Sequence, residues 1–142
     1  MNSAVAVGLL AICGAGVKAY LTIRLWKDPG RVTLHGGAMR IYPLSEEFRR
    51  GMVRASVATA AGLAFGGLLV LADGIWRQSH QGPAQGVMLD ILRASLAGIL
   101  LCGVVYLSIA LFNVPKFLVP PHMRNEPGSI AARQKNRTSD RR

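Results

Sequence analysis

Three stretches of the chain are long, apolar and free of charged side chains. They cover residues 1–17, 55–72 and 94–115, which is 17, 18 and 22 residues. A bilayer core of about 30 Å is crossed by about 20 residues of α-helix, so each stretch is long enough once its flanks are counted. A soluble helical bundle would need a polar outer face, and residues 60–71 offer none. The sequence therefore predicts three transmembrane helices.

The composition agrees with this interpretation. Charged residues make up 17% of the chain, against about 25% in soluble domains, and the mean hydropathy is +0.31. We predict an all-α integral membrane protein. Its expected segments are a first transmembrane helix (1–26), a basic loop (27–54), a second transmembrane helix (55–76), a short loop (77–89), a third transmembrane helix (90–114) and a basic, largely disordered tail (115–142).

Basic residues are spread unevenly over the connections. Residues 24–54 hold seven Lys or Arg and residues 116–142 hold another seven, whereas residues 74–89 hold only Arg77. Because basic loops stay in the cytoplasm, we expect the N-terminus outside and the first loop and the tail inside. The expected location is a cell (inner) membrane, and thirteen arginines against four lysines indicate a bacterial source.

The first half of the basic loop has the spacing of a β-hairpin. Two short runs, residues 31–35 and 38–42, are separated by Gly36-Gly37, and such a turn requires positive φ. A small juxtamembrane hairpin is therefore predicted, with an irregular loop as the alternative.

The second half of this loop is typical of a helix start. Ser45 can cap a helix whose first turn contains Glu46 and Glu47, where carboxylates suit the helix dipole. We expect a cytoplasmic extension of the second transmembrane helix. The alternative is a separate interfacial helix broken at Gly51.

The net charge of +10 indicates an anionic partner. Each Lys or Arg beside an anionic leaflet contributes about 1 kcal/mol, and both basic segments are tethered to a membrane. Nucleic acid is an unfavoured partner because residues 124–142 contain no aromatic side chain for base stacking. The residues expected to contact anionic inner-leaflet lipids are Arg49, Arg50, Arg54, Lys116 and Arg124.

Small residues four apart mark two expected helix-packing faces. They are Ala58, Gly62 and Gly66 in the second span, and Ala94 and Gly98 in the third. Small faces let helix backbones approach closely in lipid. The contact is expected within the chain, or alternatively with a membrane protein partner or a second copy.

Four charges flank the short loop at helical-neighbour spacings. Asp73 precedes Arg77 by four residues, and Asp90 precedes Arg93 by three. We expect these four to form an outer ion cluster that anchors the helix ends, with a proton or ion relay as the alternative.

No residue set in the chain specifies a reaction. Cys13 and Cys102 lie near mid-span as free thiols, and the expected topology separates His80 from His35 and His122. There is no phosphate-binding loop and no nucleophile paired with a base. We therefore expect no catalytic, cofactor-binding or metal-binding residues, no cofactor, and a protein that is not an enzyme.

Three functions are compatible with these features. The first is a small non-enzymatic accessory subunit or adaptor of a membrane complex at the inner leaflet. The second is a pore-forming lysis protein, since the chain resembles the three-span phage holins in size and topology, although without a shared motif. The third is a channel, transporter or membrane enzyme that uses the outer ion cluster.

Overall fold

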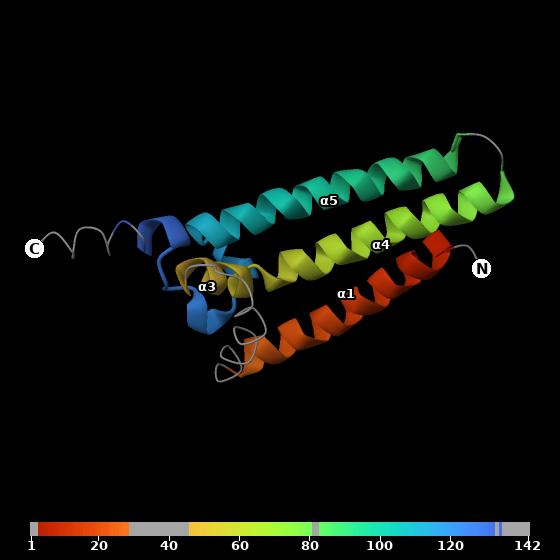
Figure 1. Cartoon of the computed structure of the whole chain (residues 1–142). Coiled ribbons are helices and arrows are strands. Elements are labelled where there is room, and N and C mark those ends of the chain that lie inside the picture. The colour runs from red at the N-terminus through yellow and green to blue at the C-terminus, as the bar shows by residue number, and fades with distance from the viewer. Residues whose placement is uncertain (1–2, 29–45, 81–82, 133, 135–142) are drawn as a thin grey trace, which may run out of the picture. The chain divides into compact units, whose positions relative to one another are not determined.

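The computed structural model of the chain describes residues 3–28, 46–80, 83–132 and 134 (Figure 1). No strand occurs in this part of the chain, which confirms the all-α class. The hairpin predicted for residues 31–42 lies outside the described residues. The elements are α1 (Ser3–Lys27), α3 (Glu46–Arg54), α4 (Ser56–Ser79), α5 (Val87–Phe112) and the 3-10 turns η2 (Lys116–Leu118) and η3 (Pro121–Met123).

The three long helices are the three predicted transmembrane segments. α1, α4 and α5 contain 25, 24 and 26 residues, and each is long and apolar enough to cross a membrane. Only between 11% and 28% of each apolar stretch is buried inside the protein. Because most of each helix exposes apolar side chains, the chain is a multi-pass membrane protein.

The helix ends follow from local chemistry. Arg24 and Lys27 occupy the last turn of α1, where cations suit the negative end of the helix dipole. α5 ends at Phe112 because Asn113 adopts a left-handed backbone with φ of 60°, which Asn tolerates better than most residues. Pro115 then prevents the helix from resuming.

One residue separates α3 from α4, so the two are separate helices, whereas a flat interfacial position of α3, as in the alternative hypothesis, stays a prediction. The interruption falls at Ala55 and not at Gly51, which lies inside α3. A Cβ on Gly51 would lie 2.8 Å from the carbonyl oxygen of Ala110 and 2.8 Å from Oγ of Ser129. Glycine at this position therefore serves a close approach between segments.

Contacts divide the chain into two units. Unit 1 comprises Met1–Ala19 and Thr59–Gly103, and unit 2 comprises Tyr20–Ala58 and Val104–Arg142. In unit 1, α1 and α4 meet through small residues. A Cβ on Gly67 would lie 2.9 Å from the backbone nitrogen of Ile12, and one on Gly8 would lie 2.7 Å from that of Leu71. The buried small residues of α4 in this unit include Ala60, Gly67 and Gly74, which are seven apart and therefore share one face.

Unit 2 contains a hydrophobic core of larger side chains. The core residues come from the end of α1, from α3 and the residue after it, from α5, and from the segment that follows α5. The turns η2 and η3 bring two of its members into the cluster. Its buried residues are Leu25, Val53, Ala55, Ile109, Val119 and Met123, with Val105, Tyr106 and Leu118 packed against them.

Candidate functional site

Five of the described polar side chains in unit 2 are buried, and three of them form long-range hydrogen bonds. Arg54, Asn113 and Ser129 are 1%, 3% and 8% exposed. Each donates a hydrogen bond to a backbone carbonyl that is distant in sequence. Together with Gly51 and Pro127 we name them the Arg54 junction, and they join α3 and the end of α5 to the segment after α5.

Arg54, the last residue of α3, connects that helix to residue 127. Its Nη1 donates to the carbonyl oxygen of Pro127 at 2.8 Å. Burial lowers the pKa of Arg54; the nearby charge of Glu126 acts in the opposite direction, and that of Arg50 lowers it further. Arg remains protonated at any physiological pH. This guanidinium is therefore a permanent positive charge that forms its hydrogen bond within the protein.

Asn113 ties the segment after α5 to the end of that helix. Its Nδ2 donates to the carbonyl oxygens of Glu126 at 2.7 Å and Arg124 at 3.2 Å. The left-handed backbone of Asn113 turns the chain out of α5, and the amide then binds the returning residues. One side chain thus acts as both helix terminator and tether.

Ser129 completes the junction. Its Oγ donates to the carbonyl oxygen of Ala110 at 2.7 Å, and the backbone nitrogen of Ala132 donates to Gly128, so residues 129–132 begin a helical turn. The sequence predicts a largely disordered tail, and within it the structure buries Gly128 and Ser129 and continues as helix to residue 132. The Pro127-Gly128-Ser129 sequence was a usable sign of a helix start.

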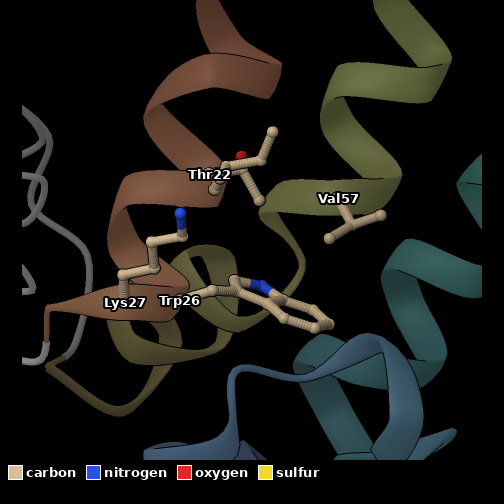
Figure 2. Close-up of a pocket in the computed structure, with 5 residues that line it drawn as sticks. Thr22, Trp26, Lys27 and Val57 are labelled. Atoms are coloured by element: carbon tan, nitrogen blue, oxygen red, sulfur yellow. The ribbon is translucent and has the colours of Figure 1, made fainter.

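An open groove lies at the end of α1. It measures about 450 Å³ and its surface is almost wholly apolar. The indole nitrogen of Trp26 is buried and has no hydrogen-bond partner among the described residues. Figure 2 shows the indole beneath Val57, with its nitrogen on the ring edge that faces the space between Thr22 and Val57. The lining residues are Thr22, Ile23, Trp26, Lys27 and Val57.

The residues predicted to contact lipid differ in their exposure to the surroundings. Arg50 and Lys116 are exposed, and their lipid contact stays a prediction. Arg124 is half-buried and its Nε donates to the carbonyl of Val119 at 3.1 Å. Arg54 is buried in the junction, so lipid contact is not proposed for it. The side chain of Arg49 lies outside the described part of the chain.

The residues predicted to form helix-packing faces also differ, because only some of them face a neighbouring helix. A Cβ on Gly98 would lie 2.6 Å from the ring of Phe65, and one on Gly62 would lie 3.6 Å from Cβ of Cys102, so both face a neighbouring helix of unit 1. A Cβ on Gly66 would meet no described atom within 4 Å. The contact expected within the chain is therefore not met at Gly66 among the described residues, and the alternative, a contact with another chain, stays a prediction there. The two alanines of the pattern are Ala58, which is buried, and Ala94, which is exposed.

The charges of the expected outer ion cluster pair within their own helices. Nε of Arg77 lies 2.8 Å from Oδ2 of Asp73 in α4, and Nη1 of Arg93 lies 3.9 Å from Oδ1 of Asp90 in α5. All four side chains are well exposed. Association of the two pairs into one cluster stays a prediction.

Sequence reasoning missed one contact near these charges. The ring of His80 stacks on that of Trp76, with centroids 3.9 Å apart and an angle of 6° between the rings. The spacing of four residues was the available sign, because such residues are neighbours along a helix.

Comparison of the chain with protein-family models, curated proteins and solved structures finds no match. The geometry alone therefore bears on function. Among the described residues, no group of three or more His, Cys, Asp or Glu could hold a metal ion. The two cysteines, Cys13 and Cys102, are free thiols.

Proposed function

We propose that this protein is a small non-enzymatic membrane protein that serves as an accessory subunit or adaptor of a membrane complex at the inner leaflet. In this role the spans anchor the chain, and unit 2 presents a folded surface to lipid and to a larger membrane protein partner. A homo-oligomer is the simplest form of such a complex.

The Arg54 junction is the observation that carries this proposal. Its buried donors bind backbone carbonyls and so hold segments together, which is a structural use of polar groups. The residues left at the surface of unit 2 include Arg50, Lys116 and Phe117, the last being 69% exposed. Neighbouring basic and aromatic side chains are typical of membrane interfaces, which supports a surface that docks rather than one that catalyses.

The proposed orientation places the N-terminus outside, and the loop of residues 27–54 and the tail in the cytoplasm of a bacterial cell. It is supported by the seven, one and seven basic residues of the successive connections. Fusions of a phosphatase that is active only outside the cytoplasm test it. We expect activity after insertion near Gln81 and none after fusion to Arg142, and the reverse pattern would invert the orientation.

Affinity purification in mild detergent tests the adaptor role. We expect a stoichiometric membrane partner with the wild-type chain, its loss with Arg54→Glu, and its retention with the control variant Asp73→Asn in unit 1. Induced expression with a membrane-potential dye is the companion experiment. Sudden depolarisation at a fixed time, without a co-purifying partner, would replace the adaptor with a holin-like pore.

A further inference from the structure

The groove at the end of α1 lacks one hydrogen-bond acceptor. The buried indole N–H of Trp26 has no partner among the described residues, and Figure 2 shows its nitrogen facing the space between Thr22 and Val57. A buried donor without an acceptor is unfavourable, and the N–H of a buried Trp normally finds one. A ligand that carries an acceptor into the groove would satisfy it.

The position of the groove indicates what that ligand is. Four of the five lining residues belong to the last two turns of α1, and Lys27 is its final residue. Since α1 is one of the three membrane-spanning helices, its end lies where hydrocarbon gives way to headgroups. Trp is enriched at that depth because its ring is apolar and its N–H is polar.

Shape and charge agree with this position. A volume of about 450 Å³ lies within the usual range of small-molecule pockets. The wall around Ile23 and Val57 is apolar, whereas the exposed ammonium of Lys27 stands at the edge. A ligand that fits combines an apolar chain, an acceptor oxygen and a negative charge.

We propose that this groove binds one anionic phospholipid. An acyl chain packs against Ile23 and Val57, an ester carbonyl accepts from Nε1 of Trp26, and the phosphate binds Lys27. The site is independent of the adaptor role, because the lipid would bind whether or not a protein partner is present.

Fluorescence quenching by brominated lipid tests the proposal. The chain has two tryptophans, so Trp76→Phe leaves Trp26 as the only fluorophore. The full-length variant is placed in phosphatidylcholine nanodiscs with a small fraction of dibrominated phosphatidylglycerol or of dibrominated phosphatidylcholine. We expect dibrominated phosphatidylglycerol to quench Trp26 as strongly as dibrominated phosphatidylcholine does at about five times the mole fraction. A fivefold preference is what about 1 kcal/mol from one lysine gives. Equal quenching by the two lipids at every mole fraction would overturn the proposal.

Two variants in the same background separate a site from general attraction. Lys27→Gln should abolish the preference, whereas Lys116→Gln, which removes the same charge from an exposed position outside the groove, should retain it. Equal loss in both variants would overturn the site in favour of surface electrostatics.

A third variant tests whether the acyl chain occupies the groove. Val57→Phe fills the space beside the indole, and it should weaken quenching by both lipids while far-ultraviolet circular dichroism stays unchanged. Unchanged quenching in this variant, or relief of quenching in the parent by soluble glycerol phosphate, would contradict the proposed acyl-chain contact.

Discussion

Units 1 and 2 of this chain are held together by different forces. In unit 1, helices approach through glycines and alanines, and the ion pairs Asp73–Arg77 and Asp90–Arg93 lie on the surface. In unit 2, large apolar side chains form a core, and buried polar groups bind backbone carbonyls. The same three long helices contribute residues to both units.

The two kinds of contact differ in the solvent that favours them. Lipid tails are as apolar as leucine, so helices within a bilayer gain little from burying large apolar side chains and associate by close contact. Water rewards burial of apolar surface and requires that buried polar groups be bonded. Unit 2 combines both kinds of contact, because it contains the ends of the candidate spans α1 and α5 as well as a core of large apolar side chains. Its polar groups are only partly bonded, since Nε of Arg54 and Oδ1 of Asn113 are buried without a hydrogen-bond partner among the described residues.

The largest expected effect is that of reversing the charge of the Arg54 junction. Arg54→Glu would bury a carboxylate facing the carbonyl of Pro127 and near the charge of Glu126. We expect the free energy of unfolding to fall by about 3 to 5 kcal/mol, which is the range for an uncompensated buried charge. Titration with sodium dodecyl sulfate in mixed micelles, followed by circular dichroism, measures this change.

Lys116→Glu is the control, because it also reverses a positive charge in unit 2 but at an exposed position. We expect it to alter stability by no more than about 0.5 kcal/mol. Equal effects of the two substitutions would remove the distinction between the units, since unit 2 would then lack a buried polar contact that matters.

The next effect compares two adjacent glycines of α4. Gly67→Leu would force a side chain against the α1 backbone, whereas Gly66→Leu enters open space. Overpacking costs about 1 to 3 kcal/mol, and the gain in helix propensity is the same for both variants. The unfolding temperature in detergent should therefore fall in Gly67→Leu and stay unchanged in Gly66→Leu.

Gly66→Leu has a separate use. If the predicted face contacts a partner or a second copy, this variant should lose chemical crosslinks to that neighbour at unchanged monomer stability. A lowered unfolding temperature for Gly66→Leu and an unchanged one for Gly67→Leu would show that the close helix contact of unit 1 has been assigned to the wrong face.

These two glycines show how far sequence patterns reach. Absence of charge is sufficient to locate α1, α4 and α5, because the requirement of the bilayer is simple. It does not identify the contact face, since one residue is a rotation of about 100° on a helix. The segment from residue 58 to residue 74 contains both a four-residue and a seven-residue series of small residues, and only the structure distinguishes them.

The Arg54 junction was less accessible to prediction for another reason. Its donors are visible in the sequence, but their acceptors are backbone carbonyls, which every residue has. The bonds of Arg54, Asn113 and Ser129 span 73, 13 and 19 residues. The groove shares this property, because Val57 reaches the indole of Trp26 only through the tertiary fold.

A smaller effect is expected at Asn113. Asn113→Ala removes the donors to residues 124 and 126 and places Ala in a left-handed conformation. Together these changes should cost about 2 kcal/mol. Asn113→Gly keeps the backbone conformation and loses only the amide, so we expect about half of that cost.

Native-state trypsin cleavage after Arg124 checks both variants, because release of the tether should expose this bond. The cleavage rate should rise in the order wild type, Asn113→Gly, Asn113→Ala. Identical rates in all three proteins would mean that residues 124–126 are held by other contacts.

The smallest effect is expected at the surface ion pairs of unit 1. Asp73→Asn breaks the 2.8 Å contact with Arg77, but both side chains are well exposed, and such pairs contribute about 0 to 1 kcal/mol. Stability should change within this range, and added salt should reduce the difference further.

The same variant separates the two hypotheses for these charges in proteoliposomes that contain a pH dye. If the charges only anchor the helix ends, proton flux stays at the level of empty vesicles in both wild type and variant. Flux in the wild type that disappears with Asp73→Asn would make the exposed pair a relay, and unit 1 would then be the functional end of the protein.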